Sequence, residues 1–79
     1  MAVTEQTVHL VCHTERMLRV LAARPDHPRK AEYDATIAGY RATWQGIGAD
    51  DRELIAAATT KVHDQTADSI AAAVAALEV

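Results

Sequence analysis

The chain has 79 residues and a formal net charge of −3, and 49% of its residues are hydrophobic. Seventeen of these hydrophobic residues are alanine and only sixteen are valine, isoleucine or leucine, so a single domain spanning residues 1–79 can build only a thin core. A net charge this mild gives no reason to expect binding to nucleic acid or to an anionic membrane surface.

The number of cysteines and the hydropathy of the chain indicate the cell compartment in which the protein is expected. Cys12 is the only cysteine, so no disulfide can form within the chain, and a reducing compartment is expected. No signal peptide is apparent, because His9 and His13 interrupt the apolar stretch near the N-terminus. No run approaches the ~20 apolar residues of a transmembrane helix. We therefore expect a cytoplasmic protein with no membrane partner.

The first predicted element is a helix over residues 5–23, with Thr4 able to cap its start. One broad side carries apolar and small residues at helical spacing, and the other side is polar. The first side comprises Thr7, Leu10, Val11, Thr14, Met17, Leu18, Leu21 and Ala22, and the second includes Gln6, His9, His13 and Arg16. Pro25 and Pro28 then break the helix, since both deny helical geometry to the residues before them.

A second helix is predicted over residues 28–45. Asp26 is a plausible N-cap for it. Gly46 and Gly48 are expected to end it, because either glycine can adopt the left-handed conformation of a helix C-cap.

The second helix has one heavy face and one bare face. The heavy face holds every aromatic residue of the chain and comprises Tyr33, Ile37, Tyr40, Trp44 and Ile47. We expect it to be buried against the first and third helices. The opposite side carries a row of alanines and glycines without a bulky side chain among them, namely Ala31, Ala35, Ala38, Gly39, Ala42 and Gly46. A glycine inside a helix costs about 1 kcal/mol relative to alanine, so Gly39 needs a reason. We predict that Ala35, Gly39, Ala42 and Gly46 form an interface with a protein partner, most simply a second copy of the chain.

A third helix is predicted over residues 51–77. Asp50 and Glu53 form a capping-box-like pair at its start, and no proline or glycine follows. No bulky apolar residue lies between His63 and Ser69, so weak packing, a bend or a break is expected in that window. The predicted fold is therefore all-α, a small three-helix bundle that dimerisation would complete.

Trp44-Gln45-Gly46 lies at the junction of two predicted helices. This tripeptide resembles the WxG turn of the WXG100 (ESAT-6-like) helical hairpins, which implies two antiparallel helices joined at that point. The chain departs from that family because two prolines break the helix before the tryptophan and because it has no C-terminal Tyr-x-x-x-Asp/Glu export signal. We favour the simpler interpretation, a core tryptophan followed by a glycine C-cap.

Metal binding is one alternative function. His9 and His13 share a helical face at the i, i+4 spacing of a chelating pair, Cys12 is close by, and His63 is a further candidate ligand. Cys12, however, points about 100° away from His13 at 3.6 residues per turn. We favour two solvated histidines and a half-buried thiol, and expect no metal site and no cofactor.

A second alternative is a nucleic-acid-binding regulator. Five cations surround the proline break, namely Arg16, Arg19, Arg24, Arg29 and Lys30, and such a cluster can contact phosphates. The glycine-rich junction, however, opens onto acids at Asp50, Asp51 and Glu53, which repel DNA. Solvated helix faces explain the cations more simply, so we expect no nucleic-acid partner.

The chain has none of the common catalytic patterns. It lacks a nucleophile elbow, a phosphate-cradling glycine loop and a carboxylate pair across a cleft. We expect no catalytic residue and no enzymatic activity. The favoured function is a non-catalytic protein-interaction or adaptor protein. Its size and acidity are also those of small phage inhibitors of larger assemblies, the anti-CRISPR proteins among them.

Overall fold

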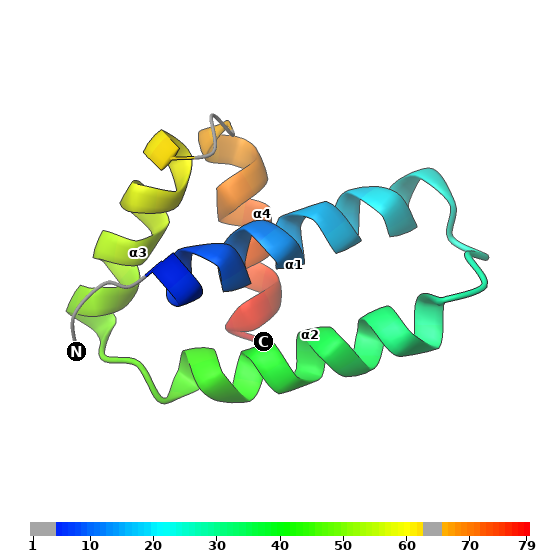
Figure 1. Ribbon diagram of the computed structural model, residues 1–79, viewed down its shortest axis with the longest axis horizontal. Coiled ribbons are helices and arrows are strands. Elements are labelled where there is room, and N and C mark those ends of the chain that lie inside the picture. The colour runs from blue at the N-terminus through cyan, green and yellow to red at the C-terminus, as the bar shows by residue number, and fades with distance from the viewer. Residues whose placement is uncertain (1–4, 63–65) are drawn as a thin grey trace.

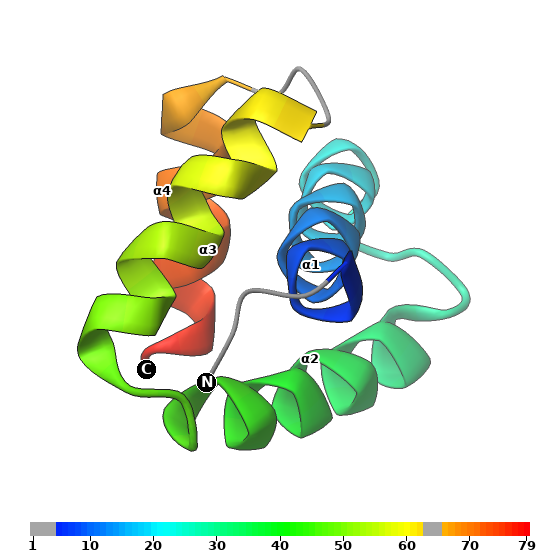
Figure 2. The same cartoon turned by 60° about the vertical axis from the view of Figure 1, so that its left-hand side comes forward.

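Helical periodicity along the chain produces two helical hairpins that cross each other. The computed structural model describes residues 5–62 and 66–79, which contain four helices: α1 (Glu5–Ala23), α2 (Lys30–Gln45), α3 (Ala49–Val62) and α4 (Ala67–Leu77). α1 and α2 run antiparallel along the long axis of the molecule (Figure 1). α3 and α4 form a second antiparallel pair that lies across one end of the first (Figure 2).

The bounds predicted for the first helix are confirmed. α1 buries its apolar side, and Val11 and Thr14 are completely inaccessible to solvent. The buried hydroxyl of Thr14 donates a hydrogen bond to the carbonyl oxygen of Leu10 at 2.9 Å, which satisfies its donor inside the core. Cys12 is also fully buried, rather than half-buried as predicted.

The predicted start of the second helix is wrong. α2 begins at Lys30, two residues late, and Asp26 does not cap it. The chain instead makes two successive turns, in which the His27 N–H donates to the Arg24 carbonyl and the Lys30 N–H donates to the His27 carbonyl, both at 3.0 Å. Arg29 therefore occupies the N-cap position, without a capping side-chain hydrogen bond.

The end of α2 is correctly predicted, but its mechanism is not. Gly46 has φ −79° and ψ −7°, which is right-handed, and none of the three glycines has a left-handed φ. A tight turn ends the helix instead: the Gly46 N–H donates to the Thr43 carbonyl at 3.1 Å and the Ile47 N–H donates to the Trp44 carbonyl at 3.0 Å. This turn carries Ile47 back into the core, where it is buried.

The predicted burial of the heavy face is confirmed. Ile37, Trp44 and Ile47 are buried, and Tyr33 and Tyr40 are half-buried. α2 packs against α1 and α4. α4 is the C-terminal part of the region predicted as the third helix, so α2 packs against this part of that region.

Two helices occupy the region predicted as a third helix over residues 51–77, because α3 ends at Val62 and α4 begins at Ala67, so the predicted count of three helices is wrong. The window without bulky apolar residues, in which a bend or break was expected, contains this division; residues 63–65 lie outside the described part of the chain. Thr66 caps α4, since its Oγ1 accepts a hydrogen bond from the Ser69 N–H at 3.1 Å.

The start of α3 also differs from the prediction. The helix begins at Ala49, so Asp50 and Asp51 lie in its first turn and Asp50 is not an N-cap. Carboxylates in a first turn favour the helix through its dipole. The carbonyl of Gly48 accepts the Arg52 N–H at 3.0 Å, which closes that turn.

One hydrophobic cluster joins all four helices. Its buried members are Leu10, Val11, Trp44, Ile47, Ile55, Ile70, Ala73 and Leu77. Trp44 is the largest side chain in the molecule that is completely inaccessible to solvent. The core is therefore concentrated where the α3–α4 pair crosses the α1–α2 pair.

Candidate interaction surface

The bare face of α2 lies on the outside of the molecule. Ala35, Gly39, Ala42 and Gly46 are all exposed, as are Ala31 and Ala38 beside them. A Cβ atom built on Gly39 would meet nothing within 4 Å, so no neighbouring element of the structure requires glycine there. In both ribbon views, no other helix covers the side of α2 that faces away from α1 and α4 (Figures 1 and 2).

The four residues of this row are uncharged, but the exposed Glu32 lies on the same stripe, seven residues before Gly39. Lys30 and Asp34 form an i, i+4 ion pair at 2.7 Å. Arg41 is turned toward α4, and its Nε donates to the carbonyl oxygen of Ala76 at 3.1 Å. The row of Ala35, Gly39, Ala42 and Gly46 is itself uncharged, and depletion of charged side chains is typical of the centre of a protein interface.

A second feature is an open pocket of about 370 Å³ between the end of α2, α3 and α4, which Trp44, Arg52 and Glu78 help to line. Glu78 Oε1 accepts a hydrogen bond from the Trp44 indole Nε1 at 3.3 Å and lies 3.6 Å from Arg52 Nη1. Arg52 Nε is buried and has no hydrogen-bond partner. These contacts tie the end of α4 to α2 and α3, so the polar groups of the pocket serve the fold.

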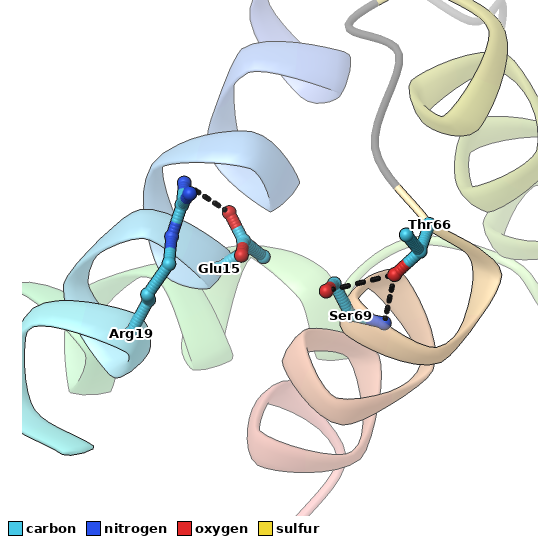
Figure 3. Close-up of polar contacts among 4 residues, drawn as sticks. All are labelled: Glu15, Arg19, Thr66 and Ser69. Carbon is cyan, nitrogen blue, oxygen red and sulfur yellow. Dashed lines mark hydrogen bonds and ion pairs between the residues drawn. The ribbon is translucent and has the colours of Figure 1, made fainter. Parts of the chain in front are cut away.

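A shallower groove of about 270 Å³ lies between α1 and α4. Figure 3 shows Glu15 and Arg19 on α1 near Thr66 and Ser69 at the start of α4. Glu15 Oε2 accepts a hydrogen bond from Arg19 Nη2 at 3.1 Å, and Thr66 Oγ1 lies 2.9 Å from Ser69 Oγ. Glu15 is buried although it is charged. The sequence carried one signal for this, an arginine four residues further on, which can neutralise the carboxylate.

The predicted histidine pair is brought together and gains a third partner. The rings of His9 and His13 are stacked with their centroids 5.9 Å apart. His13 Nδ1 lies 2.7 Å from the hydroxyl oxygen of Tyr40 on α2. Burial lowers the pKa of His13 below its ordinary value of 6.5, and the neighbouring positive charges of His9 and Arg16 lower it further.

Cys12 does not join these histidines. Its thiol is fully buried, and this burial is the main cause that raises the pKa of Cys12. Arg16 lowers this pKa and Glu15 raises it, but the pKa remains above its ordinary value. Such a thiol is a poor nucleophile and a poor ligand. Within residues 5–62 and 66–79, no three histidine, cysteine, aspartate or glutamate side chains are placed to hold a metal ion together. The predicted ligand His63 lies outside these ranges.

Most of the cations around the proline break lie beside a carboxylate. Arg19 pairs with Glu15, and Lys30 pairs with Asp34. Arg24 Nε lies 4.0 Å from Asp26 Oδ1. Three of the five cations therefore have an acid beside them, which reduces the positive potential that a phosphate backbone would meet.

Comparison of the chain with known protein families, curated proteins and solved structures finds no match. The hairpin geometry implied by Trp44-Gln45-Gly46 is also absent, because α2 and α3 meet at a steep angle instead of running antiparallel (Figures 1 and 2). None of the described helices is long and apolar enough to cross a membrane.

Proposed function

We propose that this chain is a non-catalytic protein-interaction or adaptor domain, and that the bare face of α2 is its docking surface for a second copy of itself. The observation that carries this proposal is the exposed, uncharged row of Ala35, Gly39, Ala42 and Gly46. No element of the described structure covers this row, so an intramolecular contact does not account for the glycine inside the helix.

The spacing of the row supports a two-fold symmetric contact. Its members step by four, three and four residues, and this order reads the same in both directions. Two α2 helices packed antiparallel would therefore place Gly39 opposite Ala42 of the other copy and Ala35 opposite Gly46. A self-complementary patch of this kind is what an isologous dimer requires.

The small side chains support a close contact. The distance between packed helices depends on the side chains at the contact and is about 8–10 Å in ordinary pairs. Without side chains larger than a methyl group in the row, the two backbones can approach to the lower end of that range. The cost of about 1 kcal/mol for glycine at position 39 is then offset in the dimer but not in the monomer.

The size of the surface sets the expected affinity. α2 has 16 residues and is about 24 Å long at 1.5 Å per residue. A single helix of this length buries less than the ~800 Å² per partner of a standard interface. We therefore expect weak association that depends strongly on protein concentration.

The substitutions Gly39→Ala and Ala42→Leu test this proposal. In the monomer, Gly39→Ala should raise the free energy of unfolding by about 0.5–1 kcal/mol, because the position is an open helical site. Ala42→Leu should leave the monomer almost unchanged but overpack the dimer, weakening it by about 1–3 kcal/mol. Urea unfolding of dilute protein measures the first quantity, and sedimentation equilibrium from micromolar to millimolar concentration measures the second.

Ala57→Leu is the matched control, since Ala57 is an exposed alanine on α3. It makes the same chemical change away from α2 and should leave association unchanged. The proposed dimer is wrong if the natural sequence remains monomeric over the whole concentration range. It is also wrong if Ala42→Leu and Ala57→Leu have the same effect on sedimentation.

A further inference from the structure

A second candidate site lies on α1, away from the docking face of α2. We propose that His9 and His13 chelate one divalent transition-metal ion of the zinc, nickel or copper type, with His13 binding through Nε2 and water completing the coordination. The proposal is independent of the function proposed above. It rests on the relative placement of the two rings and on the contact between His13 and Tyr40.

The two rings are already close to chelating distance. Their centroids are 5.9 Å apart and their planes differ by 25°. Two imidazoles bound to the same ion at about 2.1 Å, with a roughly tetrahedral angle between them, have centroids about 5 Å apart. Because the stacked rings have nearly parallel planes, the exposed His9 side chain must rotate before nitrogens of both rings point at one ion, and the i, i+4 spacing keeps both rings on one side of the helix.

Tyr40 positions His13 for this role. Its hydroxyl oxygen lies 2.7 Å from His13 Nδ1, across 27 residues of sequence. When Nδ1–H donates to the tyrosine oxygen, the lone pair of Nε2 is left available to a metal. Histidine ligands in metal sites are usually held in this way through their other ring nitrogen, which fixes both tautomer and ring orientation. The sequence alone favoured two solvated histidines, and the contact with Tyr40 is what changes that interpretation.

The donor atoms of the pair indicate the class of ion that it would bind. Imidazole suits zinc, nickel and copper, whereas magnesium and calcium prefer oxygen ligands. The chemistry of the pair therefore selects the borderline transition metals.

Titration of the untagged protein with Ni²⁺ or Zn²⁺ at pH 7.5 tests the site, with Mg²⁺ as the negative control. We expect calorimetric binding of both transition metals and none of Mg²⁺. At a hundredfold excess over Kd, the ion should also raise the melting temperature by roughly 5 °C or more. His9→Gln should weaken binding by about tenfold or more, because a chelate becomes a single ligand. His9 is exposed, so this variant should fold normally.

Two further variants separate the site from ordinary surface histidines. Tyr40→Phe should weaken metal binding by about tenfold through loss of the contact that orients His13. His27 precedes α2, stacks on Tyr33 and has no second histidine at i, i+4 spacing, so His27→Ala should leave the metal affinity unchanged. Equal Ni²⁺ affinity in the natural sequence and in His9→Gln would overturn the chelate. Unchanged affinity in Tyr40→Phe would refute the positioning role of Tyr40.

Discussion

Replacement of Trp44 by alanine is expected to leave the protein largely unfolded at 37 °C. Trp44 is 0% exposed and packs in the cluster that joins all four helices. A large-to-small substitution of a fully buried tryptophan costs about 3–5 kcal/mol. A domain of this length has a total stability of about 4–12 kcal/mol, and its thin core places this chain near the lower end of that range, so the substitution removes most of the stability. Thermal and urea unfolding followed by circular dichroism measure the loss.

Trp44→Phe is the control for the two roles of this side chain. Phenylalanine keeps most of the buried ring but cannot donate to Glu78 Oε1 as the indole Nε1 does at 3.3 Å. We expect it to cost less than the alanine variant, by an amount that reflects a smaller cavity and one lost hydrogen bond of about 1 kcal/mol. A shift of only a few degrees in the melting temperature of Trp44→Ala would mean that the side chain is not part of a cooperative core.

The helical periodicity of apolar residues in the sequence predicted most of the fold. The existence of α1 and the buried face around Trp44 follow from apolar residues that recur at helical spacing, whereas the ends of α1 and α2 were predicted from the prolines and glycines that follow them. These features depend on neighbours within one or two turns, which a sequence displays directly. The window after Val62 was also visible, as a stretch with no bulky apolar side chain to hold one continuous helix together.

The errors arise where backbone turns and distant contacts decide the outcome. Asp26 has the chemistry of an N-cap, but the hydrogen-bonded turns at His27 and Lys30 delay the start of α2. Gly46 can adopt a left-handed conformation, but a right-handed turn satisfies its N–H and buries Ile47. In each case two local solutions were available to the same residues, and at Gly46 the observed one carries Ile47 into the core.

The candidate sites divide in the same way. The bare face of α2 is a property of one helix and was evident from the spacing of Gly39 and its neighbours; its exposure depends on where the other helices pack. The pairing of His13 with Tyr40 joins two helices and has no signature in the sequence. The burial of Glu15 likewise required the position of α4 to be known.

The second large effect is expected at Ile55, and its neighbour Leu54 provides the matched control. Ile55 is 0% exposed, whereas Leu54 is 57% exposed, although the two are adjacent and similar in size. Among the side chains of α3 that the structure describes, Ile55 is the only large apolar one that is fully buried. The docking of α3 onto α1 and α4 therefore depends mainly on this residue.

Ile55→Ala should lower the free energy of unfolding by about 2–5 kcal/mol, because it leaves a cavity where α3 meets the core. Leu54→Ala should change it by less than about 0.5 kcal/mol, as is usual for an exposed position. Urea unfolding of both variants gives the comparison, and amide hydrogen exchange shows whether α3 opens before the other helices. Since α1, α2 and α4 retain their own contacts through Trp44 and Leu77, we expect protection to be lost first within α3. Equal losses of stability in the two variants would contradict this arrangement, because they would place Leu54 and Ile55 in the same environment.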